Sequence, residues 1–365
     1  MNVLFVSRVE MNPYVSLLAA GMERAVPGTH CTIVRDLSPR DVWRQRRTLD
    51  AIHLHWAELL YASGNWRAAW LKWLRLAASL LLAKGSGICL AYTVHNIAPH
   101  EGQHPTLNRL ANALLFRCMD VVHVHNAQTQ QEVAARFGRR RGVTLIPHGN
   151  YLHYPNHCTR AEARARLGLG DDLFIYLALG QIRPYKGVEE LLAAFSQLPA
   201  SDSHLIIAGH VHDPAYGAQI RKLAMADARV TLHDRYVPDE EIQYWMNASD
   251  VCVLPYRHVT TSGAAILAFS FGKPVIAPKL GDFSQLVGAT RGILYDASDD
   301  WPTARQERLC EALRLVRSMD LHAASNAAWA KARELDWVII GRQHLAAYAQ
   351  QSRCARLLSG QGGAG

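Results

Sequence analysis

Short apolar runs alternate with helical stretches along most of the 365 residues, and this alternation limits the fold more than any other feature. The strand-like runs of the first half span residues 2–6, 31–34, 51–55, 88–94 and 120–125, and the run 143–147 (VTLIP) closes this half. Those of the second half span residues 173–179, 204–208, 229–232, 250–254 and 274–277. Strands that alternate with helices indicate mostly parallel sheets with helices on both faces.

A turn-rich stretch, residues 148–157, interrupts the alternation near the middle of the chain. We therefore expect an α/β protein with two doubly wound, Rossmann-like domains and a cleft between them. The first domain is placed at 1–150 and the second at 165–340, with a C-terminal helix at 341–350 packing back on the first. Ligands of such sheets bind outside the carboxyl ends of the strands.

Composition and charge exclude several classes of protein. With 49% hydrophobic residues a sizeable core can form. The seven cysteines show no CxxC pair and no metal spacing, which predicts free thiols in a reducing compartment. No signal peptide and no apolar run of about 18 residues is found, so a cytoplasmic location is expected. The net charge of +8 predicts an anionic partner, and no nucleic-acid motif is present.

Residues 180–187 (GQIRPYKG) follow one buried strand and precede a helical stretch. Glycines let the backbone come close to a ligand, and a helix start offers free N–H groups. Arg183 and Lys186 add full positive charges, so the stretch predicts an anion site beginning at Gly180. The alternative is a surface loop with two solvated cations.

Three further strand ends carry polar or exposed groups. His210 follows the first of these strands, and Tyr236 and Val237 follow the second. The third is followed by a loop that runs from Tyr256 into a helix. That loop contributes the candidates Thr260, Thr261, Ser262, Gly263 and Ala264. Free N–H groups of the last three could hold a phosphate; an ordinary Ser/Thr helix cap is the alternative. Together with Arg183 and Lys186 they would form a pyrophosphate clamp.

At this point the chain resembles the GT-B glycosyltransferases, particularly the retaining family 4 enzymes. The matching motifs are G-x-I-R-P-x-K-G at 180–187, A-G-H at 208–210, Y-V-P-D-E-E at 236–241 and P-Y-x(4)-T-S-G…F-G-K-P-V-I-A across 255–277. In the first half, residues 52–55, 93–95 and 146–149 occupy comparable places. The combination and order of these motifs are specific, whereas no single one is.

The resemblance implies a hexosyltransferase that moves a sugar from a UDP- or GDP-linked donor to a glycan or polyprenyl-diphosphate-linked acceptor. Exopolysaccharide or glycolipid synthesis at the cell surface is the expected setting. Arg183 and Lys186 would neutralise the diphosphate in place of a metal, and no D-x-D motif appears. The backbone at Tyr236 and Val237 would meet the nucleobase. No cofactor and no metal are expected.

The chain departs from family 4 at one place. These enzymes usually carry two glutamates eight positions apart, and the corresponding positions here, about 259–260 and 267, are not acidic. An inverting GT-B enzyme, for example one dependent on GDP-mannose, therefore remains an alternative. A non-catalytic regulator that binds nucleotide-sugars is another.

In the first domain, His95 ends a strand, where an imidazole could bond a sugar hydroxyl or assist proton transfer. Its alternative role is to cap the next loop. An inverting enzyme also needs a general base, and the candidates are Glu58, His95 and Glu10. Glu10, Asn12 and Tyr14 follow the first strand and are expected to bind the acceptor. The histidine pairs at i, i+2 spacing, His53 with His55 and His123 with His125, lack the carboxylate pattern of a metal site.

Residues 66–77 (WRAAWLKWLRLA) combine three tryptophans with three cations. At 100° per residue, Trp66, Trp70 and Trp73 fall on one side, with the cations largely outside that stripe. Such a helix is typical of an interfacial segment, so we expect peripheral attachment to the anionic inner face of the membrane. The alternative is an amphipathic helix packed on the sheet.

Overall fold

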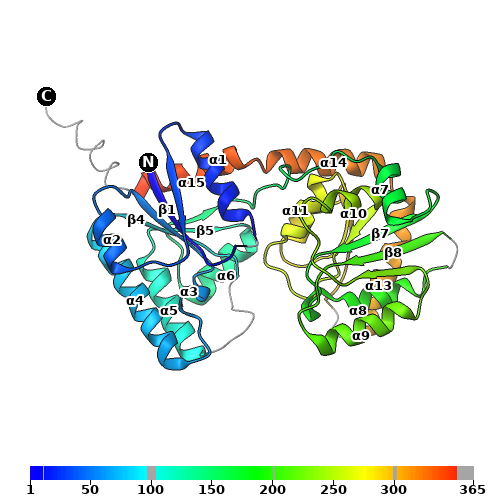
Figure 1. Ribbon diagram of the computed structural model, residues 1–365, viewed down its shortest axis with the longest axis horizontal. Helices are drawn as coiled ribbons and strands as arrows, with labels where there is room; N and C mark the ends of the chain where they lie inside the picture. The colour runs from blue at the N-terminus through cyan, green and yellow to red at the C-terminus, as the bar shows by residue number, and fades with distance from the viewer. Residues whose placement is uncertain (11, 97–103, 200–201, 299–301, 352–365) are drawn as a thin grey trace. The chain divides into compact units, whose positions relative to one another are not determined.

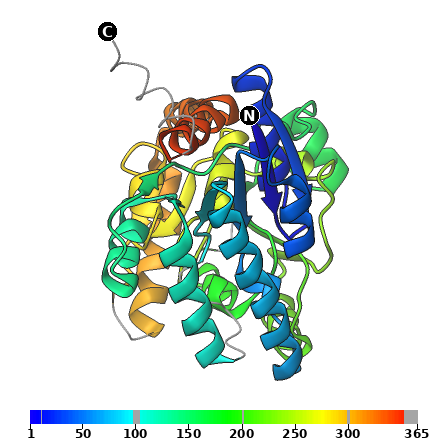
Figure 2. The same ribbon diagram turned by 90° about the vertical axis from the view of Figure 1, so that its left-hand side faces the viewer.

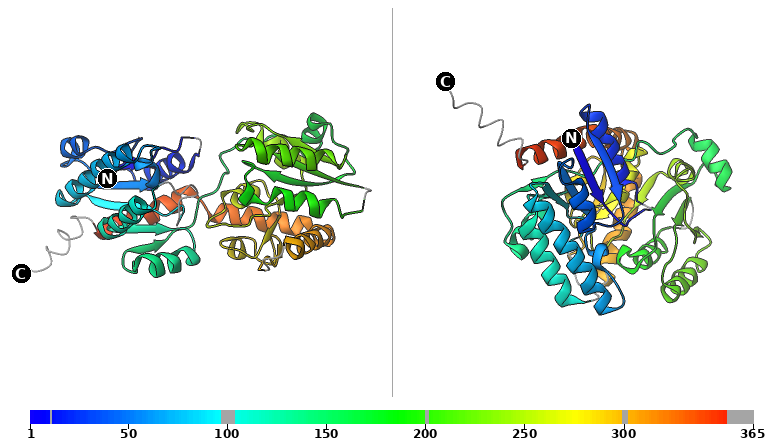
Figure 3. Two further views of the ribbon diagram at one scale, coloured as in Figure 1. Left: turned by 90° about the horizontal axis from the view of Figure 1, so that it is seen from below. Right: turned by 60° about the vertical axis from the view of Figure 1, so that its left-hand side comes forward.

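The computed structural model describes residues 1–365 apart from 11, 97–103, 200–201, 299–301 and 352–365. The chain forms two compact units. Unit 1 comprises Met1–Gly149 together with the segment that begins at Leu335, and unit 2 comprises Asn150–Glu334. Each unit is built on one parallel sheet with helices on both of its faces (Figures 1 and 3).

Unit 1 contains a six-stranded sheet in the order β2-β1-β3-β4-β5-β6. Its strands are β1 (Asn2–Val6), β2 (His30–Val34), β3 (Ala51–His55), β4 (Cys89–Thr93), β5 (Val121–Val124) and β6 (Val143–Leu145). Its helices are α1 (Tyr14–Ala25), α2 (Pro39–Gln45), α3 (Glu58–Tyr61), α4 (Trp66–Gly85), α5 (Pro105–Cys118), α6 (Ala127–Phe137) and α15 (Trp337–Gln351).

Unit 2 contains a second six-stranded sheet in the order β12-β11-β10-β7-β8-β9. Its strands are β7 (Phe174–Leu179), β8 (Ser203–Ala208), β9 (Val230–His233), β10 (Val251–Val253), β11 (Val275–Pro278) and β12 (Gly292–Tyr295). Its α-helices are α7 (Arg160–Leu167), α8 (Val188–Phe195), α9 (Pro214–Met225), α10 (Ile242–Ala248), α11 (Gly263–Ser270), α12 (Phe283–Leu286), α13 (Pro302–Leu315) and α14 (Leu321–Glu334). Two 3-10 turns span Pro184–Lys186 and Val316–Ser318.

The expected α/β fold with two doubly wound sheets is confirmed. The expected strands are present, with bounds that differ from the expected ones by a few residues at most. Strand β12 was not anticipated, because its four residues, GILY, form too short an apolar run to stand out from the flanking polar sequence.

Strand order in each sheet reverses at one place. In unit 1 the reversal lies at β1, which has β2 on one side and β3 on the other. In unit 2 it lies at β7, between β8 and β10. Loops that leave the carboxyl ends of the two strands beside such a reversal run in opposite directions and leave a crevice, which is where doubly wound sheets bind ligands.

Two apolar cores sandwich the sheet of unit 1. One joins the sheet to α2, α3, α4 and α5, which lie together on one face, and α4 and α5 run side by side (Figure 2). The other joins the opposite face to α1 and α15. In unit 2 one core lies between the sheet and α8, α9 and α13.

Helix α15 returns to unit 1 through a close crossing with α1. A Cβ atom added to Gly341 would lie 2.6 Å from the backbone nitrogen of Met22, and one added to Gly21 would overlap the backbone of Trp337. Each helix thus presents a glycine at the point where the other backbone passes. The last helix of the described chain therefore completes the core that the first helix begins.

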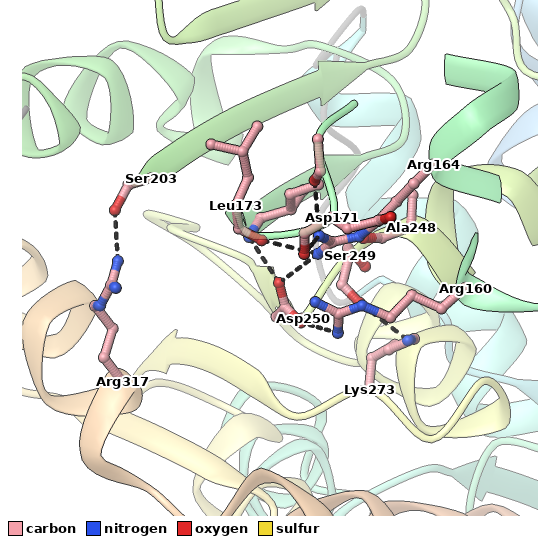
Figure 4. A network of polar contacts seen from close by, with 12 residues as sticks. Arg160, Arg164, Asp171, Leu173, Ser203, Ala248, Ser249, Asp250, Lys273 and Arg317 are labelled. Atoms are coloured by element: carbon pink, nitrogen blue, oxygen red, sulfur yellow. Dashed lines mark hydrogen bonds and ion pairs between the residues drawn. The ribbon is translucent and has the colours of Figure 1, made fainter. Parts of the chain in front are cut away.

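A buried ion pair fixes the amino ends of β7 and β10. Figure 4 shows the Arg164 guanidinium surrounded by acceptors: it donates to the backbone oxygens of Ala248, Gly170, Asp171 and Leu173 and to the Asp250 carboxylate. The second Asp250 oxygen also pairs with the half-exposed Arg160. Arg164 is fully buried, so its charge is stable there only because every direction holds an acceptor. This network lies at the amino ends of the strands, whereas the loops described below leave the carboxyl ends.

We expect Arg164→Met to lower the free energy of unfolding of unit 2 by about 3–5 kcal/mol, because it leaves the Asp250 charge buried with a weaker partner. Denaturant unfolding of the full chain measures this loss. Arg160→Met is the matched control: Arg160 bonds the same carboxylate but its side chain is 53% exposed, so its loss should cost no more than about 1 kcal/mol. Equal losses in the two variants would contradict this account.

Candidate functional site

The site in unit 2 is built on glycines at the ends of neighbouring strands. Gly209, after β8, has a φ of +153°, and a Cβ there would overlap the carbonyl oxygen of Gly180, which follows β7. Gly187 has a φ of +66°, and a Cβ there would overlap the carbonyl oxygen of Pro255, which follows β10. The loops after β7, β8 and β10 therefore touch backbone to backbone, which only glycine permits.

A pocket opens where these loops meet, between the carboxyl ends of β7 and β10. Its lining includes Gly180, Ile182, Lys186, Leu254, Pro255 and Tyr256. The Lys186 ammonium lies 5.2 Å from the centre of the buried Tyr256 ring. Desolvation by burial lowers the pKa of Lys186, nearby Arg183 adds to the decrease, and Tyr185 opposes it.

The cations of the 180–187 loop differ from most of the others in unit 2. Arg221, Arg229, Arg235, Arg257 and Arg317 each pair with a carboxylate at 2.8 Å or less. Within the described residues, neither Arg183 nor Lys186 forms an ion pair, and the Arg183 Nε is buried without a hydrogen-bond partner. Two adjacent charges that are partly desolvated and uncompensated favour the binding of an anion.

The loop after β10 leads from the buried Tyr256 through the half-buried Thr260 and Thr261 into α11. Ser262 is the N-cap of that helix, and its hydroxyl accepts the Ala265 N–H at 3.2 Å. The Asp282 carboxyl lies beside the Ser262 backbone N–H, which lowers the pKa of that carboxyl. The side of the Ser262 N–H is thus shared with a buried carboxyl, and whether it also meets a phosphate stays a prediction. Gly263 and Ala264 supply the first-turn N–H groups of α11.

Asp282 is a buried carboxyl that the sequence interpretation missed. Burial raises its pKa to about 7, while the Ser262 N–H and Lys331 act in the opposite direction. It follows β11, next to Gly281, where a Cβ would overlap the carbonyl oxygen of Val259. The sequence signal that indicates it is its position shortly after the apolar run that forms β11.

The remaining donor candidates lie after β8 and β9. His210 is exposed, and its carbonyl accepts the Ile182 N–H at 2.9 Å, so it adjoins the 180–187 loop. Tyr236 is 51% exposed and its hydroxyl bonds Asp239, whereas the Val237 side chain is buried. All three follow the carboxyl ends of strands in the same parallel sheet.

In unit 1, His95 follows β4 and is held on three sides. Its ring stacks on Trp56 with centroids 3.8 Å apart and meets the edge of Tyr14 at 4.9 Å. Its Nε2 lies 3.0 Å from the Nδ1 of His55. Burial lowers the pKa of His95, and nearby His55 lowers it further. The ring is fixed and neutral, so it suits hydrogen bonding better than proton uptake.

Behind His95 lies a cluster of buried imidazoles on the α1 and α15 side of the sheet. Its members are His53, His55, His123, His125, His148 and His344. Neighbouring rings follow one another closely, for example His53 and His55 at 4.1 Å and His123 and His344 at 4.2 Å. Tyr348 of α15 bonds the His53 Nδ1 at 2.6 Å. In the described part of the chain, no three of the His, Cys, Asp and Glu residues are arranged to hold a metal ion.

The other acceptor-side candidates occupy three different environments. Glu58 begins α3, bonds the side chain of Asn96, and has a pKa raised by burial. Glu10 is exposed and pairs with Arg35 at 2.5 Å. Asn12 accepts the Tyr14 N–H and so helps to start α1. Tyr14 is fully buried among aromatic rings, which gives it a packing role and leaves little of its side chain for direct contact with a ligand.

Helix α4 forms where expected, and Asn65 caps it by accepting the N–H groups of Arg67 and Ala68. The expected outward stripe is only partly outward. Trp66 is 59% exposed, but Trp70 and Trp73 are half-buried and pack against the core. The exposed apolar residues of α4 are Trp66, Leu71, Leu74 and Leu81. Of the helices in the described chain, none is both long and apolar enough to cross a bilayer.

Comparison with known proteins identifies the class. Residues 174–315 match the model of the family Glycosyl transferases group 1. Anabaena Alr3699/HepE, solved in complex with UDP and glucose, has a TM-score of 0.74 at 18% identity, over 96% of this chain and 100% of that one. Sucrose-phosphate synthase from Thermosynechococcus elongatus has a TM-score of 0.72 at 20% identity, covering 96% and 98%. The chain is therefore a glycosyltransferase of the GT-B fold that resembles the group 1 enzymes.

The chain is also similar in sequence to two glycosyltransferases of stated activity. GDP-mannose:glycolipid 4-beta-D-mannosyltransferase from Xanthomonas campestris pv. campestris is 26% identical over 342 residues, which is 93% of this chain and 88% of the relative. D-inositol 3-phosphate glycosyltransferase 1 from Catenulispora acidiphila is 27% identical over 289 residues, covering 71% and 68%.

The histidine cluster predicts that unit 1 loses stability in mild acid. Burial lowers the folded-state pKa of all six histidines, to about 4 for His125 and about 3 for His148 and His344. The unfolded chain titrates near 6.5, so below that pH it binds protons that the folded unit excludes. Stability is complete above pH 6.5 and falls by about 1.4 kcal/mol per pH unit for each histidine below it.

Calorimetric unfolding of the full chain between pH 7.5 and 4.5 measures this dependence. His123→Phe should reduce the slope, because both ring nitrogens of His123 lie buried without hydrogen-bond partners. His322→Gln is the control, since His322 is exposed on α14 of unit 2. A slope in His123→Phe as steep as in the unchanged chain would contradict the prediction.

Proposed function

We propose that the chain transfers a hexose from a UDP- or GDP-linked donor to a glycan or lipid-linked acceptor, without a metal. The observation that carries this proposal is the pair of uncompensated cations, Arg183 and Lys186, beside the pocket at the strand reversal of unit 2. A diphosphate there would offset the cost of desolvating both charges. Electrostatic stabilisation of a leaving group by preorganised cations lowers the barrier to its departure.

In the proposed reaction the bond between the anomeric carbon and the diphosphate oxygen breaks, and the acceptor oxygen bonds that carbon. The negative charge that develops on the diphosphate falls on Arg183 and Lys186. If the acceptor attacks directly, its hydroxyl proton passes to a base. Glu58 suits this role better than the other candidates, because burial raises its pKa while Glu10 is held by Arg35 and the pKa of His95 is lowered.

More specifically, we propose that the donor is GDP-mannose and that the acceptor is a glycolipid. A relative named for that donor, for a glycolipid acceptor and for a beta linkage matches 93% of this chain. The absence of acidic residues near 259–260 and 267 also favours an inverting enzyme over the retaining pattern. Surface polysaccharide or glycolipid synthesis is the corresponding biological role.

A basic, partly apolar face of unit 1 supports a peripheral location on the inner membrane surface. Helices α4 and α5 contain no Asp or Glu, and the neighbouring α2 contains only Asp41. Cations on or beside these helices are Arg40, Arg44, Arg46, Arg47, Arg67, Lys72, Arg75, Lys84, Arg109 and Arg117. Exposed Trp43 on α2 and Trp66, Leu71 and Leu74 on α4 could enter the interface of an anionic bilayer, where a lipid-linked acceptor resides.

The donor site is tested with Arg183→Ala combined with Lys186→Ala. Each charge-assisted contact contributes about 1.5–3 kcal/mol, so binding of UDP or GDP should weaken by at least about 100-fold. Titration calorimetry measures it, together with nucleotide release from a panel of nucleotide-sugars. Arg166→Ala with Lys222→Ala removes the same charge from elsewhere in unit 2 and should leave binding unchanged.

Glu58→Gln provides the contrasting result in the same assay. Nucleotide binding should persist while transfer to the acceptor falls by about 100-fold or more. Unaltered nucleotide binding in the Arg183, Lys186 variant would refute the donor site, whereas full turnover in Glu58→Gln would refute only the choice of base.

The membrane face is tested with Trp66→Ser combined with Leu74→Ser. Binding to vesicles that contain anionic lipid should fall by about 10-fold or more, because roughly 1.5–3 kcal/mol of apolar burial is lost per side chain. Co-sedimentation measures it. Leu223→Ser with Met225→Ser removes two exposed apolar side chains of unit 2 and is the control. If both double variants bind vesicles as well as the unchanged chain, this face is not the membrane contact.

A further inference from the structure

Arg257 joins the two loops that frame the pocket of unit 2. It lies in the loop after β10, and its backbone N–H donates to the Tyr185 carbonyl at 2.7 Å. Its Nη1 donates to the Pro184 carbonyl at 3.3 Å. Both acceptors lie between Arg183 and Lys186 in the loop after β7. The two walls of the crevice are thus connected directly beside the cations.

The same guanidinium is anchored to the first turn of α8. Its Nη2 lies 2.8 Å from a Glu189 oxygen, and its Nε donates to Glu190 at 2.8 Å. Each glutamate has a further partner: Tyr216 of α9 donates to Glu189 at 2.5 Å, and Arg305 of α13 lies 3.7 Å from Glu190. Arg257 therefore links the loop after β10 to three helices on one face of the sheet.

These contacts separate Arg257 from the proposed phosphate-binding cations. Its charge is compensated by two carboxylates, whereas no carboxylate of the described residues pairs with Arg183 or Lys186. Its role is consequently mechanical. The close approach of Gly187 to the Pro255 carbonyl fixes one point of contact between the loops, and Arg257 fixes a second point two residues further along.

We propose that Arg257 is a positioning residue of the donor site. It holds the loops after β7 and β10 at a fixed separation, so that Lys186 lines the pocket and Arg183 lies in the same loop before a nucleotide diphosphate arrives. This inference rests on the proposed function. Without the tether, the loop after β7 must be ordered during binding, and that cost appears in the donor affinity.

The test compares Arg257→Ala and Arg257→Lys in the full chain. We expect the KM for the nucleotide-sugar and the Kd for UDP or GDP to rise about 10-fold or more in Arg257→Ala. The kcat at saturating donor should change much less, because ordering is complete once the donor is bound. Arg257→Lys keeps the charge but cannot bond two carboxylates and a carbonyl in one plane, so it should give an intermediate loss.

Removing Arg257 also leaves Glu189 without a cationic partner and Glu190 with Arg305 alone, near an anion site, so the variant with Glu189→Gln and Glu190→Gln added is needed. If the tether matters, this triple variant stays weak for the donor. If it regains full affinity, the effect is one of charge alone and the proposal is overturned. Thermal unfolding of each variant, with nucleotide absent, shows whether the fold is retained.

Arg229→Ala is the matched control, because Arg229 also bonds a carboxylate and two backbone carbonyls. Arg229 lies at the start of β9, at the amino end of that strand and not at its carboxyl end. This substitution should lower stability without changing the donor KM. An unchanged KM in Arg257→Ala, with binding lost in the Arg183, Lys186 variant, would refute the tether and leave the donor site intact. Loss in neither would refute the donor site itself.

Discussion

Backbone contact between strand-end loops is the constraint on which the proposed donor site depends. Gly209 lies against Gly180, and Gly187 lies against Pro255, at separations that a side chain would not allow. Three loops from three strands are thereby drawn together at the reversal of strand order. The Lys186 ammonium of one loop thereby lies 5.2 Å from the centre of the Tyr256 ring of another. The placement of the candidate site thus follows from the topology and from two glycines.

The two units handle buried polar groups in opposite ways. Unit 2 pairs several of its buried or half-buried charges, as Arg164 pairs with Asp250, whereas neither Arg183 nor Lys186 pairs with a carboxylate of the described residues. Unit 1 instead buries neutral groups, a run of imidazoles that remain uncharged because burial disfavours their protonation. The contrast suits a division of labour in which one unit attracts an anion and the other presents hydrogen-bonding groups without net charge.

Much of the fold was predictable from local pattern, because period and turn residues mark strands such as 51–55 and 173–179. The 180–187 loop was also recognisable as a candidate anion site, since its glycines and cations all lie within one short stretch. Contacts between distant segments were not: nothing local indicates that Asp282 lies beside the Ser262 N–H or that Arg257 bonds the Tyr185 carbonyl. Periodicity placed the tryptophans on one stripe, but the neighbouring helices decide which of them is covered, and Trp70 and Trp73 are.

The glycine crossing of α1 and α15 has a consequence for synthesis. Unit 1 receives His344 and Tyr348, two members of its interior, from a helix that is translated after all of unit 2. On the ribosome, the second unit can reach its final contacts while the first still has an open face lined with imidazoles and apolar side chains. Unit 1 can therefore be completed only after the whole of unit 2 has been synthesised.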